Sequence, residues 1–297
     1  MREDRRPEPR RGIPLRAVVP NAVTALALCV GLTSVRFAIA GEWDKAIIAI
    51  VAAGVLDGMD GRIARMLRGQ TRFGAELDSL SDVIAFGVAP AIVLYLWSLQ
   101  HLPPSLQHLA RFGWIFALAY AACMALRLAR FNANIDVEEQ PHKSAGFLTG
   151  VPAPAGAGLL LLPIYLWLAS DQQWTWLADH RLVAPWAALV AFLVISSVAT
   201  FSWGSLRLRR NVRLEAIVII ALIGGALVSA PWHTLSAVAF LYVVMIPFSI
   251  ASYARVRRLR AAAAVRASLP AGPEPNPPEP GPAPARRRQS PPGPPAT

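Results

Sequence analysis

Apolar segments about as long as a membrane-spanning helix follow one another along most of this chain. A helix needs about 20 apolar residues to cross the hydrocarbon core of a bilayer. Short polar connections separate several of the segments, so neighbouring helices are expected to run antiparallel. The pattern predicts an all-α, polytopic integral membrane bundle with about eight transmembrane helices, near residues 18–40, 44–66, 76–99, 110–131, 152–169, 183–203, 212–230 and 232–253.

The two ends of the chain lack this pattern. Residues 1–16 are rich in Arg, and residues 270–297 hold 12 of the 26 prolines. A segment with so few apolar residues cannot bury a core of its own. We therefore expect a basic cytoplasmic arm (1–16), a membrane domain (17–254) and a basic, Pro-rich disordered tail in the cytoplasm (255–297).

The triplet Ala38-Ile39-Ala40, after a basic start, imitates the cleavage site of a secretory signal. Polar and helix-perturbing residues interrupt the apolar stretch before it, however: Pro20, Asn21, Thr24 and Arg36. The segment is therefore predicted to be a retained first helix.

The distribution of positive charge predicts the orientation of the bundle. The 297 residues carry a net charge of +11, although only 16% of them are charged. With the N-terminus inside, 25 of the 29 Lys and Arg residues fall on the cytoplasmic side, which is the side that basic loops prefer. Both termini are thus expected in the cytoplasm. The positive charge is then expected to orient the protein in the membrane and to contact anionic lipid head groups. No nucleic-acid partner is expected.

Four aspartates stand at the cytoplasmic ends of the second and third predicted helices. Asp57 and Asp60 are three residues apart, and Asp78 and Asp82 are four apart, so each pair shares one helix face. Ionised carboxylates at membrane depth are costly and indicate a functional site. If the pairs meet across a cleft, they need cations to neutralise them, and all-oxygen ligands favour Mg²⁺ or Mn²⁺.

Small residues surround these aspartates. The spacing of Gly54 and Gly58 is consistent with close helix packing and equally with the approach of a substrate, so both interpretations stay open for these two glycines. For Gly61 and Gly74, which stand next to the aspartates, substrate approach is the preferred interpretation.

The complete spacing resembles a known signature. It comprises Asp57-Gly58-x-x-Gly61-x-x-Ala64-Arg65, eight further residues, and Gly74-x-x-x-Asp78-x-x-x-Asp82. This pattern resembles that of the CDP-alcohol phosphotransferase family. The resemblance implies a membrane enzyme that transfers a substituted phosphate group from a CDP-linked donor to a hydroxyl and releases CMP.

The resemblance also implies site residues. Two divalent cations, Mg²⁺ or Mn²⁺, would be held by Asp57, Asp60 and Asp78, with Asp82 as catalytic base and possible fourth ligand. It further implies a catalytic core at 17–170, extra helices at 183–254 and a homodimer. The expected contacts of the nucleotide and donor are Asn21, Thr24, Gly58, Gly61, Ala64, Arg65 and Gly74.

A second set of segments resembles the branch of this family that uses L-serine and CDP-diacylglycerol in a prokaryotic inner membrane. It comprises PNAVT (20–24), TRFG (71–74), ELDSLSD (76–82), FGVAPA (86–91), ALRLARFN (125–132) and FLTGVPAPAGA (147–157). Arg127 and Arg130 can hold the serine carboxylate or a phosphate, and their alternative role is anchoring at the interface.

Two alternatives stay open. Within the family, the acceptor can instead be glycerol phosphate, inositol phosphate or choline. Outside it, carboxylates at membrane depth can serve an ion-coupled transporter. That interpretation would favour carboxylates at mid-bilayer and repeated halves, whereas here they cluster at one end.

Overall fold

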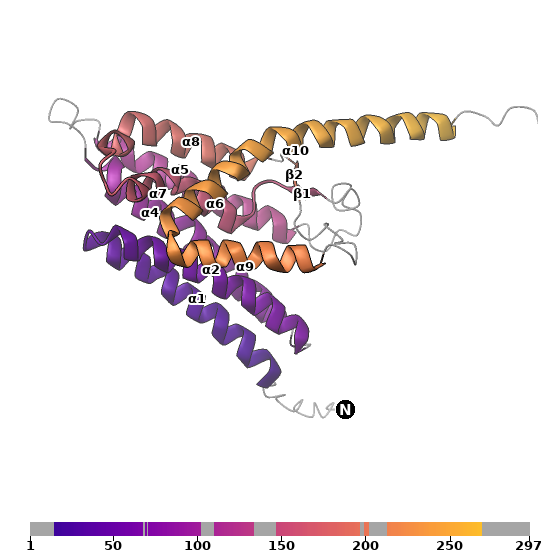
Figure 1. Cartoon of the computed structure of the whole chain (residues 1–297). Coiled ribbons are helices and arrows are strands. Elements are labelled where there is room, and N and C mark those ends of the chain that lie inside the picture. The colour runs from indigo at the N-terminus through magenta and orange to yellow at the C-terminus, as the bar shows by residue number, and fades with distance from the viewer. Residues whose placement is uncertain are drawn as a thin grey trace, which may run out of the picture. The chain divides into compact units, whose positions relative to one another are not determined.

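The computed structural model describes residues 15–67, 69, 71–101, 110–133, 147–196, 199–201 and 213–268. The described part is helical except for two three-residue strands (Figure 1). The first half contains α1 (Leu15–Ile39), α2 (Trp43–Met66), α3 (Arg72–Asp82), η1 (Val83–Val88), α4 (Ala89–Leu94), η2 (Tyr95–Leu99) and α5 (Ala110–Ala133). The second half contains β1 (Phe147–Thr149), α6 (Ala153–Leu160), α7 (Leu162–Ala169), η5 (Thr175–Ala178), α8 (His180–Ile195), β2 (Ala199–Phe201), α9 (Arg213–Ser229) and α10 (Pro231–Ser268).

Four helical stretches of the described chain are long and apolar enough to cross a membrane. They are Val18–Ile39, Arg72–Leu99, Phe112–Ala133 and Pro231–Ser249. α2 is equally long, but its second half carries Asp57, Asp60 and two arginines, which shorten its apolar run. The expectation of a helical membrane protein is therefore confirmed at this level.

The fifth expected span, 152–169, is divided into α6 and α7. Pro163 has no N–H to donate to the carbonyl group of Leu159, four residues earlier, and its ring disfavours a continuous helix. Trp186 of α8 also donates to this carbonyl group, because its Nε1 lies 3.0 Å from the Leu159 oxygen, which accepts from a backbone N–H at the end of α6 as well. The break is therefore stabilised by a neighbouring helix.

The sixth expected span, 183–203, is wrong at its C-terminal end. α8 stops at Ile195, and residues 199–201 form β2, which pairs antiparallel with β1. The pairing places Phe147 opposite Phe201 and Thr149 opposite Ala199. It holds the segment that leads into α6 beside the end of α8.

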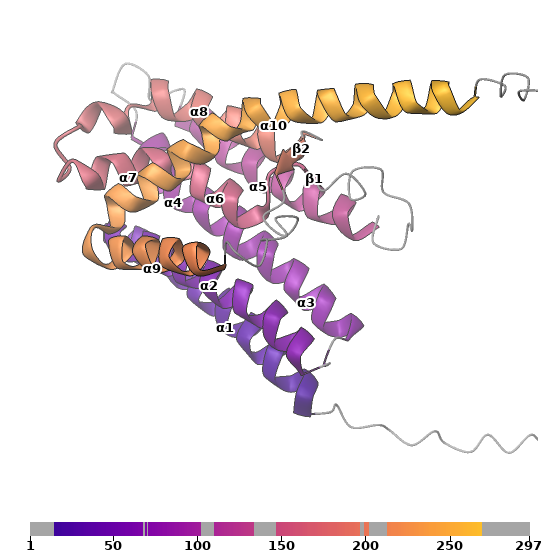
Figure 2. The ribbon, with the colours of Figure 1, turned by 45° about the vertical axis from the view of Figure 1, so that its right-hand side comes forward.

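The helices that carry the four aspartates pack in one group. α1 packs along α2 and also contacts α3, which continues through two π-helical segments to Leu99. Figure 2 shows α1, α2 and α3 side by side. In the first π-helical segment, the carbonyl oxygen of Phe86 accepts a hydrogen bond from the Tyr120 hydroxyl at 3.0 Å. α5 is thereby tied to the helix that carries Asp78 and Asp82.

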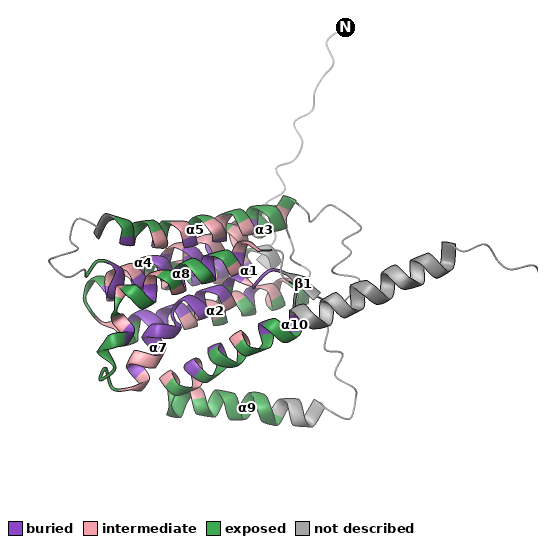
Figure 3. Cartoon of the chain, turned by 90° about the horizontal axis from the view of Figure 1, so that it is seen from above, coloured by how far each residue is buried: buried purple, intermediate pink, exposed green. Residues whose placement is uncertain are grey.

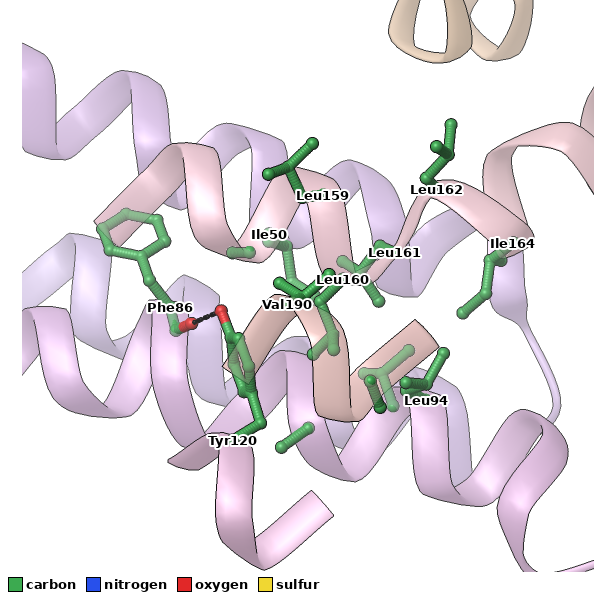
Figure 4. Close-up of a cluster of buried hydrophobic side chains, with 14 of the residues drawn as sticks. Ile50, Phe86, Leu94, Tyr120, Leu159, Leu160, Leu161, Leu162, Ile164 and Val190 are labelled. Carbon is green, nitrogen blue, oxygen red and sulfur yellow. Dashed lines mark hydrogen bonds between the residues drawn. The ribbon is translucent and has the colours of Figure 1, made fainter. Parts of the chain in front are cut away.

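The core of this bundle lies between α4, α5, α6 and α8 (Figure 4). Its largest fully buried side chains include Phe86, Leu94, Tyr120 and Leu160. By contrast, most described side chains of α9 are exposed (Figure 3). Exposed apolar side chains on such a helix suit contact with lipid, which is as apolar as they are.

The chain divides into two compact units, residues 1–255 and 256–297. α10 crosses this boundary and runs on to Ser268, so residues 255–268 are helical, although they were expected in a disordered tail. The expected basic arm, up to residue 14, and the Pro-rich tail from residue 269 lie outside the described residues.

Candidate active site and metal centre

Three of the four aspartates converge as the spacing predicts. α2 carries Asp57 and Asp60, and α3 carries Asp78. One carboxylate oxygen from each lies within 4.8 Å of the others. The sequence separation of 18 residues between Asp60 and Asp78 is bridged by the turn after α2, which places α3 against the α1–α2 pair. This oxygen-only donor set fits a hard divalent cation.

Asp60 is the most buried member, with 4% of its surface exposed. The Thr24 hydroxyl of α1 donates to its Oδ2 at 2.6 Å. Thr24, an expected contact of the nucleotide, thus also orients a carboxylate of the acidic group. The Ser81 hydroxyl in turn donates to the Thr24 carbonyl group at 3.4 Å, so α3 also contacts α1 here.

Asp82 is not a member of this close group of three carboxylates. It is one turn beyond Asp78, and its carboxylate lies next to that of Asp57. Its Oδ1 is buried and has no hydrogen-bond partner among the residues that the structure describes. A buried oxygen of this kind is costly unless it acquires a partner, such as a cation or a proton donor.

A cavity of about 270 Å³ opens beside the acidic group. Small residues of three helices line it together with Asp60 and Asp78. The expected donor contacts Asn21, Thr24, Gly61, Ala64 and Gly74 are all among the lining residues. Most of the predicted set is thus brought together in one cavity.

Gly74 makes the approach of α3 to α1 possible. A Cβ atom at this position would lie 2.7 Å from Oδ1 of Asn21. The start of α3 is fixed by Thr71, whose side chain accepts a hydrogen bond from the Gly74 N–H at 3.0 Å. The sequence analysis included Thr71 in the TRFG segment but not as a helix cap, although Thr is among the residues preferred at the N-cap.

The glycines of α2 differ from Gly74. A Cβ at Gly58 would meet nothing within 4 Å, and one at Gly61 would only touch the Arg65 side chain at 3.6 Å. Helix packing therefore does not require glycine at either position. Gly54 faces Phe86 at an ordinary contact distance of 3.6 Å. Of the two interpretations left open for Gly58, packing receives no support.

Arg65 is exposed, and it does not line the cavity.

The two arginines of α5 have different surroundings. Arg130 is exposed, and its Nη2 donates to the carbonyl oxygen of Ile195 at 2.5 Å, where α8 ends. Arg127 is half-buried and interacts electrostatically with Asp82 and Tyr120. Its Nε is buried without a hydrogen-bond partner in the described part of the chain. Of the two arginines, Arg127 is therefore the one with an electrostatic interaction with Asp82.

Gly150 shapes the wall beside Arg127. It has a φ of +79°, a conformation that glycine adopts without strain. A Cβ there would lie 2.9 Å from the carbonyl oxygen of Ser196 and 3.9 Å from Nε of Arg127. The glycine of the GVPAPAG segment thus lets the chain pass between α5 and the end of α8.

A match to a family sequence profile decides the classification of this chain. The sequence profile of CDP-alcohol phosphatidyltransferase matches residues 17–194, which include all four aspartates. The chain belongs to the CDP-alcohol phosphatidyltransferase family. A second profile, CDP-alcohol phosphatidyltransferase 2, matches residues 211–247, where the motif analysis found nothing diagnostic.

Similar members of this phosphatidyltransferase family carry one name, CDP-diacylglycerol–serine O-phosphatidyltransferase. The protein of Mycobacterium tuberculosis is 36% identical over 83% of this chain and 82% of its own length. That of Mycobacterium leprae is 37% identical over 82% of this chain and 78% of its own. That of Helicobacter pylori is 30% identical over 76% of this chain and 87% of its own.

Proposed function

We propose that this chain transfers the phosphatidyl group from CDP-diacylglycerol to the hydroxyl of L-serine, giving phosphatidylserine and CMP in phospholipid biosynthesis. The observation that carries the proposal is the convergence of Asp57, Asp60 and Asp78 beside a cavity lined by the donor-contact residues. The names of the relatives support serine as the acceptor.

Asp57, Asp60 and Asp78 would hold two divalent cations, Mg²⁺ or Mn²⁺, with Asp82 as a possible further ligand. The close approach of the three carboxylates supports this assignment, and so does the buried Oδ1 of Asp82, which has no hydrogen-bond partner in the described chain. When bound, such cations supply positive charge that stabilises the diphosphate and the departing CMP.

Asp82 is the proposed general base. Its carboxylate accepts the proton of the serine hydroxyl while the serine oxygen bonds to the phosphorus of the phosphatidyl group. The bond from that phosphorus to the bridging oxygen breaks, and CMP leaves with this oxygen. The position of Asp82 beside Asp57, but outside the close group of three, supports a separate role.

The donor would occupy the cavity between α1, α2 and α3. Asn21, Thr24, Ala64 and Gly74 line it directly, and the Thr24 hydroxyl also donates to Asp60. Gly58 and Gly61 leave the α2 backbone open to a phosphate group, since a Cβ at Gly58 would meet nothing within 4 Å and one at Gly61 would meet only the Arg65 side chain. Arg65, which is exposed one turn after Gly61, would contact the nucleotide from the rim.

Arg127 is the proposed partner of the serine carboxylate. Its guanidinium can hold a carboxylate through two parallel N–H groups, and it already lies near the proposed base. Arg130 is assigned instead to the structural bond with Ile195. This division refines the expectation that either arginine recognises the acceptor.

For the membrane arrangement we propose about eight spans, both termini in the cytoplasm and the active site at the cytoplasmic face. The distribution of basic residues supports this orientation. A catalytic core at 17–170, extra helices at 183–254 and assembly as a homodimer complete the proposal.

The test measures CMP release by the purified protein with CDP-diacylglycerol, Mg²⁺ or Mn²⁺, and one alcohol at a time. Serine should support rapid release, while glycerol phosphate, inositol phosphate and choline should not. Asp57→Ala should abolish release, and Asp44→Ala, which removes an exposed carboxylate at the far end of α2, should not. A preference for another alcohol would contradict the serine assignment.

A further inference from the structure

Thr24 is a buried polar side chain of α1 that contacts the acidic group on another helix. Only 4% of its surface is exposed, the same fraction as for Asp60. Its hydroxyl oxygen lies 2.6 Å from Oδ2 of Asp60 and 3.1 Å from the carbonyl oxygen of Pro20. A hydroxyl has one proton to donate, so only one of these two oxygens can receive it at a time.

The two distances indicate which oxygen receives the Thr24 proton. A hydroxyl that donates to an ionised carboxylate lies about 2.5–2.7 Å from it, and such a bond is about twice as strong as one between neutral groups. The contact with Asp60 has this length, whereas the contact with the Pro20 carbonyl group is longer. The proton therefore points across the contact between α1 and α2, toward Asp60.

A second buried hydroxyl connects Thr24 to α3. The side chain of Ser81 is 3% exposed, and its hydroxyl donates to the backbone carbonyl group of Thr24 at 3.4 Å. Ser81 stands between Asp78 and Asp82 on α3. α1 carries no carboxylate of the acidic group, but at Thr24 it is hydrogen-bonded to both helices that do.

The bond from Thr24 restricts the orientation of the Asp60 carboxylate. The terminal torsion of an aspartate has broad preferences, so without a partner the two oxygens can turn through a wide range. A group that hydrogen-bonds a metal-binding side chain fixes the direction of the ligand atoms, and its loss typically lowers metal affinity about 10- to 100-fold. Thr24 is placed to have this effect on Asp60.

We propose that Thr24 is a positioning residue of the metal site, whose hydroxyl fixes the orientation in which Asp60 meets a divalent cation. This role rests on the proposed function, in which Asp57, Asp60 and Asp78 hold the cations, and it adds α1 to the metal site. Thr24 was expected only as a contact of the nucleotide. With the positioning role, it also affects the binding of the cation when no nucleotide is present.

The experiment measures the binding of Mn²⁺ alone to the full-length protein in detergent, from the loss of the electron paramagnetic resonance signal of free Mn²⁺. Thr24→Val keeps the shape of the side chain and removes the hydroxyl, so the Kd for Mn²⁺ should rise roughly 10-fold or more. Thr33→Val is the matched control on α1. The Thr33 hydroxyl donates to a backbone carbonyl group, that of Cys29, at 2.7 Å. Because this hydroxyl orients no carboxylate, its loss should leave the Kd for Mn²⁺ within about twofold of the wild-type value.

Two further variants of Thr24 separate the hydroxyl from the shape of the side chain. Thr24→Ser keeps the hydroxyl and should bind Mn²⁺ nearly as well as the wild type. Thr24→Ala removes the hydroxyl without placing a methyl group against Asp60, so it decides the question if Thr24→Val does not fold. The positioning role is wrong if the variants without the hydroxyl bind Mn²⁺ as tightly as the wild type, or if Thr24→Ser loses as much affinity as they do.

Asp57→Ala separates this role from the metal assignment on which it depends. If Asp57→Ala weakens Mn²⁺ binding and Thr24→Val does not, the role of Thr24 is wrong and the ligand assignment stands. If Asp57→Ala binds Mn²⁺ as tightly as the wild type, the ligand assignment is wrong and the role of Thr24 falls with it. The release of CMP with serine tests the proposed reaction separately from both.

Discussion

At the scale of single residues, the surroundings of Asp82 separate it from the other aspartates. It lies beside Asp57 and near Arg127, and one of its oxygens is buried without a partner in the described chain. Asp82→Asn keeps the shape of the side chain and one oxygen but cannot accept a proton. A positioned general base contributes about 10²–10⁴-fold to a rate, so kcat should fall by at least that factor.

The same preparation should be used to measure the affinity for CDP-diacylglycerol. Asp82→Asn should bind the donor better than Asp57→Ala does, because Asp57, Asp60 and Asp78 remain in place. If both variants lose donor binding equally, Asp82 acts mainly as a metal ligand. If Asp82→Asn keeps its turnover, another group activates serine.

Gly74 gives a steric prediction at the same scale. In Gly74→Ala the new methyl group would lie 2.7 Å from Oδ1 of Asn21, so α3 or Asn21 must shift within the donor cavity. The KM for CDP-diacylglycerol should rise several-fold. Gly224→Ala is the control, since a Cβ on that exposed stretch of α9 meets nothing within 4 Å. Equal donor kinetics in the two variants would contradict the steric role of Gly74.

The spacing of the aspartates was sufficient to predict that Asp57, Asp60 and Asp78 meet, because helix periodicity and one reversing turn determine their relative positions. The separation of Arg127 from Arg130 could not be predicted. Both arginines lie at the end of α5, and their roles depend on where α8 ends and exposes the Ile195 carbonyl group. That position follows from tertiary packing.

At the scale of elements, the break between α6 and α7 depends on Trp186. Its indole N–H donates to the carbonyl group of Leu159, which cannot accept from the N–H-less Pro163 and also accepts from a backbone N–H at the end of α6. Trp186→Phe keeps an aromatic ring but removes the hydrogen bond from the indole. The loss of this one hydrogen bond is expected to destabilise the fold by about 0.5–1.5 kcal/mol.

Thermal denaturation in detergent should therefore show a lower midpoint for Trp186→Phe, with an unchanged KM for serine and for the donor. Trp176→Phe is the matched control, since that side chain is 59% exposed. A midpoint equal to that of the control would mean that the hydrogen bond contributes little to stability.

The apolar pattern located most helices but not their irregularities. It predicted one span over 152–169 and another over 183–203, whereas the chain breaks near Leu161 and leaves the helix after Ile195. A proline inside an apolar run allows either a kink or a complete break. The three-residue strands are too short to produce an alternating pattern, and their pairing joins residues 50 or more positions apart.

At the scale of the whole molecule, the aspartates, the donor cavity and Arg127 all belong to the unit that ends at Arg255. A chain that ends after Ser268 keeps this unit and the whole of α10. Its specific activity should stay within a few-fold of the full-length protein when both are inserted normally in membranes. Loss of activity in a normally inserted truncated chain would assign a catalytic or assembly role to residues 269–297.

The central claim is that one reaction joins serine to the phosphatidyl group and releases CMP. The most direct measurement follows labelled serine into chloroform-soluble lipid while CMP is counted in the same sample, with purified protein, CDP-diacylglycerol and a divalent cation. One phosphatidylserine should form for each CMP, and neither product should form without the cation or in Asp57→Ala. CMP release without labelled lipid would identify a hydrolase. If neither product forms with all components present, the proposed reaction is wrong.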